Sequence, residues 1–332
     1  IVNLDALTYA GSLENLRELP AQGKHVFVQG DISDRELVEG LLRKHAIEVI
    51  VHLAAESHVD RSISGPAPFI QTNVVGTFSL LEAVRQVWLE ENPVSLDRLR
   101  FHHVSTDEVF GSLPPDGPPF SETTPYAPNS PYAASKASSD HLVRAYAHTY
   151  GLPITITNCS NNYGPYQFPE KFIPLVILCA MEGKPIPIYG DGQQVRDWLY
   201  VEDHCEALWI VLKRGRLGET YNIGGDTQVT NLDLARLLCS IADEYLPDSP
   251  YLPHESLIDF VADRPGHDQR YAMDTSMISG ELGWKPRQTL ETGLRRTVEW
   301  YLAHQEWLRS IRNRSTYQEW YRENYVERGE RA

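Results

Sequence analysis

The sequence predicts an α/β protein in which a doubly wound parallel sheet is joined to a smaller α/β lobe. Apolar segments of strand length alternate with longer helical segments through the first half of the 332 residues. Several strands are apolar at consecutive positions, which is typical of parallel strands covered by helices on both faces. Each strand ends in acidic, hydroxyl or amide side chains, and doubly wound sheets bind ligands beyond the carboxyl ends of their strands.

From residue 25 onward, the expected strands and helices alternate along this half of the chain. Strand segments cover residues 1–5, 25–31, 49–57, 100–108 and 153–162. Helical segments cover residues 34–45, 73–91 and 130–151. This alternation is characteristic of a Rossmann-type nucleotide-binding fold.

The second half is less regular and predicts the smaller lobe. A helix is expected at residues 171–183, then a strand, a turn and another helix within 185–215, and last helices from Leu290 onward. Connections near residues 247–253 and 265–266 are rich in proline and glycine. We therefore expect a nucleotide-binding domain over residues 1–160 and 197–224, and a second lobe over 161–196 and 225–332.

Composition excludes some classes of function. The formal net charge of −15 disfavours a nucleic-acid partner, because phosphate backbones bind basic surfaces. The four cysteines are far apart and form no CxxC pair, which disfavours a zinc site or a disulfide framework and suits the reducing cytoplasm. No apolar run reaches the ~18 residues of a membrane span, and no signal peptide is evident.

A dinucleotide-binding fold normally begins with a strand, a glycine-rich turn and a helix that receives the pyrophosphate. No GxGxxG occurs here, yet Asp5 ends the first strand, where an acid binds the ribose hydroxyls of NAD. Such an acid would repel the 2′-phosphate of NADP. We therefore expect the first strand–turn–helix unit to be missing from a sequence that opens at Ile1; the alternative is that Asp5 only caps a loop.

The segment "YAASK" places Tyr132 and Lys136 on one face of a helix. A lysine ammonium beside a phenol favours the phenolate and lowers its pKa from ~10 towards the range of a working base. Alone, this spacing also fits an ordinary solvated helix face. Together with Thr106 at the end of a strand, it predicts removal of a proton from a sugar hydroxyl while hydride passes to NAD.

A set of motifs shows that the chain resembles a particular family of enzymes. The chain resembles the extended short-chain dehydrogenase/reductases, and among them the nucleotide-sugar 4,6-dehydratases, from residue 1 to about residue 300. Phe110 replaces a tyrosine usual in that family, and the loop Ser112–Glu122 is short. The motifs are "LDALTYAG", "GDI", "HLAAESHVDRSI", "STDEVFG", "SPYAASKASSDHLV", "TNCSNNYGPYQFPEKFIP", "YGDGQQVRDWLYVEDH", "ETYNIGG" and "DRPGHDQRYAMD".

This resemblance implies an NAD-dependent hydro-lyase. Oxidation at C4 of a hexose makes the C5 proton acidic; Glu108 would then be the base at C5 and Asp107 the acid for the C6 hydroxyl. Neighbouring carboxyls can be held in opposite protonation states by repulsion and burial. The alternative is that both acids merely cap the following loop.

Relatives indicate the substrate. Sugar 4-epimerases resemble the chain but lack both acids, whereas GDP-mannose dehydratases and UDP-glucuronate decarboxylases keep only the glutamate. The triplet Thr106–Asp107–Glu108 therefore points to dTDP-glucose as the substrate. Two alternatives stay open: a 4,6-dehydratase or 4-epimerase acting on another nucleotide sugar, and a non-catalytic dinucleotide-binding protein.

Position by position, the resemblance also implies binding residues. Arg196 and Arg264 are the cations expected on the pyrophosphate, and a homodimer through helices 66–91 and 131–150 is expected. The adjacent His102 and His103 lie in a strand without metal-ligand spacing. The cofactor set is Asp5, Ala6, Leu7, Thr8, Asp31, Ile32, Leu53, Ala54, Ala55, Glu56, Ser57, Thr72, Tyr132, Lys136 and Asn162. The substrate set is Ser57, Thr106, Asn161, Lys171, Phe172, Pro187, Ile188, Tyr189, Arg196, Asn231, Asp263, Arg264, Pro265, Gly266 and His267.

Overall fold

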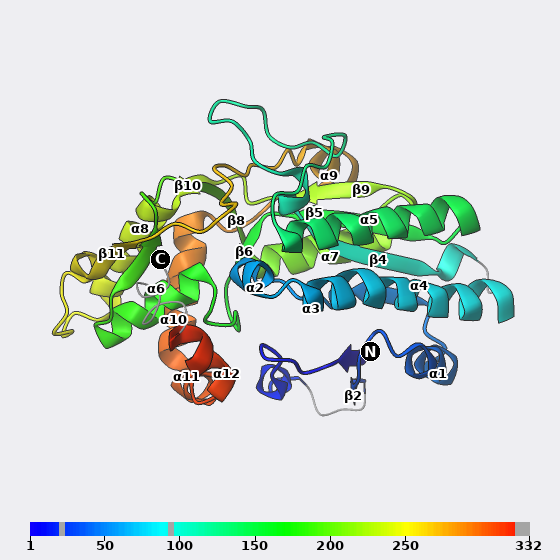
Figure 1. Ribbon diagram of the computed structural model, residues 1–332, viewed down its shortest axis with the longest axis horizontal. Coiled ribbons are helices and arrows are strands. Elements are labelled where there is room, and N and C mark those ends of the chain that lie inside the picture. Colours follow the sequence, from blue (N-terminus) through cyan, green and yellow to red (C-terminus); the bar gives the residue numbers. More distant parts are fainter. Residues whose placement is uncertain (20–23, 92–95, 323–332) are drawn as a thin grey trace.

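The computed structural model describes residues 1–19, 24–91 and 96–322 as a parallel sheet with helices on its faces and a second lobe beside it (Figure 1). The strands are β1 (Val2–Asp5), β2 (Val26–Gln29), β3 (Val49–His52), β4 (Arg100–Thr106), β5 (Ile154–Cys159), β6 (Asn161–Tyr163), β7 (Ile186–Tyr189), β8 (Val195–Tyr200), β9 (Thr220–Ile223), β10 (Gln228–Thr230) and β11 (Ile258–Val261).

Helices connect the strands. The helices are α1 (Arg35–His45), α2 (Val59–Ser64), α3 (Ala67–Phe69), α4 (Thr77–Val84), α5 (Pro131–Tyr150), α6 (Phe172–Glu182), α7 (Val201–Arg214), α8 (Asn231–Tyr245), α9 (Ser276–Leu282), α10 (Leu290–Ala303), α11 (Gln305–Arg312) and α12 (Ser315–Tyr321). Short 3-10 turns lie at Leu13–Leu16, Leu96–Arg98, Asp107–Phe110 and His254–Leu257, and π-helical turns at Ile70–Gly76 and Arg85–Glu91.

The central sheet has the strand order β3-β4-β5-β9, and all its pairs are parallel. The register pairs Thr106 with Cys159, so β4 and β5 end side by side. Helices α1, α4 and α5 bury one face of the sheet, and α7 with α9 buries the other. A parallel sheet covered on both faces is the arrangement that the apolar strands predicted.

Helix α5 shows how local sequence positions the site. The Ser130 hydroxyl accepts a 3.1 Å hydrogen bond from the Ala133 amide, and Pro131 occupies the first turn. The helix ends at Gly151, whose φ of 72° is the left-handed conformation that glycine adopts most easily. These signals fix the helix over the end of β4, with Tyr132 in its first turn.

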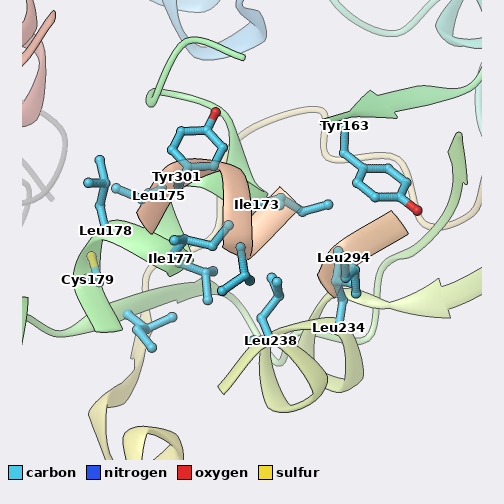
Figure 2. Close-up of a cluster of buried hydrophobic side chains, with 14 of the residues drawn as sticks. Tyr163, Ile173, Leu175, Ile177, Leu178, Cys179, Leu234, Leu238, Leu294 and Tyr301 are labelled. Atoms are coloured by element: carbon cyan, nitrogen blue, oxygen red, sulfur yellow. The ribbon is translucent and has the colours of Figure 1, made fainter. Parts of the chain in front are cut away.

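The second lobe has a core of its own. Helices α6, α8 and α10 pack their apolar faces together around Ile173, Ile177, Leu234 and Leu294, all fully or nearly fully buried (Figure 2). Helix α6 is apolar along most of its length because it is covered all round. In Figure 1 this lobe lies at the left, across the strand ends from α4 and α5.

The structure differs from the sequence prediction at several places. The single strand expected over residues 153–162 is divided into β5, which ends at Cys159, and β6, which belongs to another sheet. The segment 185–215 contains a second strand, β8, which the polar residues Arg196 and Asp197 disguised; β8 lies between β10 and β6. Strands β1 and β2 form a parallel pair of their own, separate from the four-stranded central sheet. No helix within the described ranges is both long and apolar enough to cross a bilayer.

Candidate active site

The site begins where β4 ends. Thr106 is the last residue of the strand, and its hydroxyl accepts a 3.3 Å hydrogen bond from the Glu108 amide, starting the 3-10 turn Asp107–Phe110. The same hydroxyl donates to Asp107 Oδ1 at 3.2 Å. The three polar residues are therefore held together by one strand end and one tight turn.

Gly111 ends this turn in a conformation that other residues adopt with difficulty. Its φ is 84°, and a Cβ placed on it would lie 2.4 Å from the backbone oxygen of Ala127. A side chain at this position would displace the loop that covers the turn. Glycine therefore lets the turn pack directly under residue 127.

The two acids have different electrostatic surroundings. Burial raises the pKa of Asp107 well above its ordinary value, and the carboxyls of Glu108 and Asp197 raise it further. Asp107 is 1% exposed, and its Oδ2 has no partner among the described residues. Burial also raises the pKa of Glu108, but the cations of Arg264, Lys171 and Arg196 oppose that rise. This difference favours a protonated Asp107 beside an ionisable Glu108.

Tyr132 and Lys136 lie beside this turn on α5. The Tyr132 ring packs edge-on against Phe69, with ring centroids 6.3 Å apart, and belongs to a small buried cluster with Val59. The Lys136 ammonium is buried and donates a 2.9 Å hydrogen bond to the backbone oxygen of Val104. Both catalytic candidates are thus fixed by packing against β4 and the helical segment 67–91.

The sequence predicted that Lys136 lowers the pKa of Tyr132, and the direction of that prediction is wrong. Burial raises the pKa of Tyr132 well above its ordinary value, the charge of Glu108 adds to this rise, and a hydrogen bond with Thr106 opposes it. The physical reason is that burial, the largest influence, disfavours the charged phenolate more than its neighbours favour it.

Most residues assigned to the cofactor lie at the carboxyl ends of β1, β2 and β3 and on the helical segment 67–91, while Tyr132 and Lys136 lie on α5 and Asn162 lies in β6. Asp5 and Asp31 are exposed, and each carboxylate accepts a backbone hydrogen bond, from Leu7 at 2.7 Å and from Ser33 at 2.8 Å. Asp5 therefore does cap the loop that follows it, as the alternative interpretation predicted. Its carboxylate is nevertheless exposed to solvent. Leu53 is 60% exposed at the end of β3.

A pocket between the strand ends and the second lobe collects most of the residues assigned to the substrate. It is lined by Glu108 from the turn, by Asn161 and Asn162 from β6, and by residues of the second lobe. The other predicted members of its lining are Lys171, Phe172, Pro187, Tyr189, Arg196, Asn231, Arg264 and His267.

The remaining substrate candidates lie around this pocket. Ser57, Asp263, Pro265 and Gly266 are exposed and adjoin lining residues in the chain. Ile188 is completely buried in the core of the second lobe, so only its backbone is available to a ligand.

Charged groups in the pocket are paired with one another. Asp60 accepts hydrogen bonds from Arg264 at 3.3 Å and from the Tyr189 hydroxyl at 3.0 Å. Burial alone would raise the pKa of Asp60, but Arg264 and other partners hold it below its ordinary value. Arg264 Nε has no partner among the described residues although it is buried. Lys171 donates to the backbone oxygen of Ser57 at 3.0 Å.

Arg196 is a buried cation on the pocket wall. It is 5% exposed, and its guanidinium lies 4.3 Å from the centre of the Tyr271 ring. Two of its nitrogens donate 2.8 Å hydrogen bonds to the backbone oxygens of Val195 and Asp268. A guanidinium held in this way is fixed in position for an anionic group in the pocket.

Several site residues were not found from the sequence. Glu170 is 4% exposed and accepts hydrogen bonds from the Tyr9 hydroxyl at 2.8 Å and from Arg61 at 3.1 Å, which ties the loop after β1 to the second lobe. Asn73 is buried and exchanges two hydrogen bonds with the backbone of Glu56, at 2.8 and 2.9 Å. These contacts join positions far apart in the chain, and no local pattern predicts them.

The comparisons agree with this geometry. The family model described as GDP-mannose 4,6-dehydratase matches residues 1–297. A dTDP-glucose 4,6-dehydratase of Xanthomonas campestris pv. campestris is 58% identical over 94% of this chain and 88% of its own length. The chain belongs to the dTDP-glucose 4,6-dehydratase family.

Solved structures of the dTDP-glucose 4,6-dehydratases have the same fold. The Streptomyces venezuelae enzyme, determined with NAD and TYD bound, is 45% identical with a TM-score of 0.84, covering 93% of this chain and 89% of that one. The Bacillus anthracis enzyme in complex with NAD is 44% identical with a TM-score of 0.81, covering 94% and 90%. The predicted family and the doubly wound α/β class are therefore confirmed.

Proposed function

We propose that the chain converts dTDP-glucose into dTDP-4-keto-6-deoxyglucose and water. The observation that carries this proposal is the pair Asp107 and Glu108 beside Tyr132, because burial and neighbouring charges give the two carboxyls different acidities. An epimerase has no need of an acid and a base for removing water. The high identity to dTDP-glucose 4,6-dehydratases supports the same substrate.

The first step is oxidation at C4 of the glucose. Tyr132 takes the proton of the C4 hydroxyl, while Thr106 holds that hydroxyl from the end of β4. Bound NAD would supply the acceptor for the C4 hydride and the source of the hydride that C6 receives. The Lys136 ammonium supplies positive charge near the phenol once the substrate excludes water from the site.

The second step is loss of water across C5 and C6. The C4 ketone makes the C5 proton acidic, and Glu108 removes it. Asp107, held protonated by burial, gives its proton to the departing C6 hydroxyl. Because one carboxyl gains a proton and the other loses one, the pair has the same total number of protons after elimination.

The residues present fit both ends of NAD. Asp5 offers an exposed carboxylate to the adenosine ribose, and Lys136, one turn after Tyr132 on α5, and Asn162 in β6 would bind the nicotinamide ribose. The side-chain oxygen of Asn162 is buried without a partner among the described residues, as expected of a group that meets a ligand. A glycine-rich turn for the pyrophosphate stays a prediction.

We assign the nucleotide diphosphate to the second lobe. Arg196 and Arg264 would bind the pyrophosphate, and Lys171, Phe172, Asn231 and His267 would line the rest of the nucleotide site. The proposed division into a domain of residues 1–160 and 197–224 and a lobe of 161–196 and 225–332 follows from this assignment. Catalysis would then occur where the two parts meet.

Two further properties belong to this proposal. A homodimer is supported by Ile70, Val75 and Phe78, which are 48%, 41% and 46% exposed along the helical segment 67–91. The cytoplasm is the proposed compartment, because NAD-dependent chemistry and unpaired cysteines fit a reducing environment.

The deciding experiment is mass spectrometry of dTDP-glucose incubated with the full-length protein in heavy water. Loss of one water with gain of one deuterium is expected, since C5 receives its new proton from solvent. An unchanged mass would contradict the proposal once bound NAD has been demonstrated. Parallel incubations with UDP- and GDP-sugars identify another nucleotide sugar as the substrate if only those react.

A further inference from the structure

A buried polar cluster lies behind the catalytic residues, between α5 and β4. Its centre is Asp140, which is completely buried. The carboxylate accepts hydrogen bonds from His103 Nε2 at 3.0 Å, from the Ser105 hydroxyl at 2.8 Å and from the Tyr126 hydroxyl at 2.8 Å. The mechanism above uses none of these four residues.

Asp140 lies one helical turn after Lys136 on the same face of α5. The Lys136 ammonium is also buried, and it donates a hydrogen bond to the uncharged Val104 oxygen. Burial lowers the pKa of Lys136, and Asp140 is the largest influence that opposes this. A buried ammonium needs an opposite charge nearby to remain protonated.

The other groups around the pair do not replace that charge. Burial lowers the pKa of His103 to about 4, so its imidazole is neutral and donates through Nε2. Arg144 donates to the hydroxyls of Tyr126 at 2.8 Å and Thr220 at 3.2 Å. The titratable and charged groups facing the pair are His52 on β3, His103 on β4, Tyr126 before α5, Arg144 on α5 and Cys159 on β5.

We propose that Asp140 is a positioning residue whose buried carboxylate balances the charge of the Lys136 ammonium and fixes α5 against β4. His103, Ser105 and Tyr126 hold the carboxylate in place and in its ionised form. Lys136 therefore stays charged in a site that would otherwise neutralise it. The effect on turnover rests on the proposed function, whereas the pairing of the two buried charges does not.

The first test is a thermal unfolding cycle on the full-length protein with its bound cofactor. The variants are Asp140→Asn, Lys136→Met and the double variant. Removing one of two opposite buried charges leaves the other uncompensated, whereas removing both does not. We expect each single variant to lower Tm by more than the double variant does.

Additive losses of Tm in the double variant would overturn the pairing. If Asp140→Asn alone fails to fold, the double variant is expected to recover folding, and its failure would equally overturn the proposal. The unfolding cycle measures stability alone, so its result does not depend on whether the proposed substrate is correct.

The second test is the pH dependence of NADH formation in Asp140→Asn, with Ser105→Ala as the matched control. Ser105→Ala removes one hydrogen bond to the same carboxylate and keeps its charge. A nearby opposite charge shifts a pKa by about 1–3 units. Loss of the Asp140 charge in Asp140→Asn should therefore lower the pKa of Lys136 and let it lose its proton as pH rises. We expect the rate to fall ~10-fold or more below wild type near pH ~8.5 and within ~3-fold near pH ~6.

A purely structural role of Asp140 would lower the rate by the same factor at every pH, and that result would overturn the proposal. Ser105→Ala is expected to change the rate slightly and uniformly across pH. If wild type itself forms no NADH from any nucleotide sugar, the proposed function fails, and the unfolding cycle still decides the pairing.

Discussion

The ionisable groups at the two ends of the pocket have different electrostatic surroundings. At the catalytic end, Asp107 and Tyr132 are buried without an oppositely charged partner, and burial raises the pKa of both. At the nucleotide end, Arg264 and Asp60 are bonded to each other and both stay charged. The difference teaches that burial without an ion-pair partner keeps an acid such as Asp107 protonated for transfer, whereas paired charges preserve a cation for binding an anion.

The largest expected effect is at the catalytic end. Tyr132→Phe keeps the ring against Phe69 but removes the only group proposed to take the C4 proton. We expect NADH formation to fall by ~10⁴-fold, the upper end of what one acid–base group contributes. The measurement is NADH absorbance under single turnover.

The matched control is Tyr146→Phe on the same helix, where the hydroxyl donates to Glu82 at 2.7 Å, away from the pocket. That variant should oxidise substrate at nearly the wild-type rate. If both variants lost activity alike, folding of α5 and not proton transfer would explain the loss.

The next effect separates the two neighbouring carboxyls. Glu108→Gln cannot take the C5 proton, so elimination should slow by ~10²-fold or more while oxidation at C4 continues. Bound NADH measures oxidation at C4, and incorporation of deuterium from heavy water measures removal of the C5 proton. Asp107→Asn is the companion variant.

Asp107→Asn should still exchange the C5 proton with solvent but lose water slowly, because the acid and not the base has been removed. Undiminished deuterium incorporation in Glu108→Gln would show that another group is the base.

A smaller effect is expected at the nucleotide end. Arg264→Gln removes a charged donor from the proposed pyrophosphate site and should weaken dTDP binding by ~10-fold, as is typical of a charge-assisted hydrogen bond. Titration calorimetry at two salt concentrations measures the loss. Arg236→Gln is the control, because this exposed arginine also pairs with an acid, Glu255, at 3.1 Å.

The control variant should bind dTDP as the wild type does. Equal affinities for wild type and Arg264→Gln would place the pyrophosphate elsewhere in the pocket.

The smallest effect couples the two ends. Burial raises the pKa of Glu108, and Arg264 is the leading influence that opposes this rise. Glu108 acts as a base only when ionised, so the rate of elimination should fall as pH drops through its raised pKa. In Arg264→Gln this acidic limb should move to higher pH by up to about 1 unit, measured as kcat at saturating substrate. An unmoved limb would mean that the two ends are electrostatically independent.

The sequence was sufficient where structure follows from neighbouring residues. The strand end at Asp5, the strand that leads into Thr106 and the helix carrying Tyr132 were predicted because apolar runs, a capping serine and a final glycine are local signals. Strand β8 was missed because Arg196 and Asp197 are stabilised by partners from distant segments, the Asp268 and Gly225 backbones. Ion pairs such as Asp60 with Arg264 join residues about two hundred positions apart and leave no local pattern.

The turn that ends at Gly111 also limits which mutations this site can accept during evolution. Because a side chain there would meet the Ala127 oxygen at 2.4 Å, the backbone of residues 107–111 cannot easily lengthen or bend. Insertions and deletions in this turn are therefore unfavourable, and variation is confined to exchanging one side chain for another at fixed places. A new reaction on this scaffold would arise by point substitution at positions 107 and 108 and leave the spacing of the turn intact.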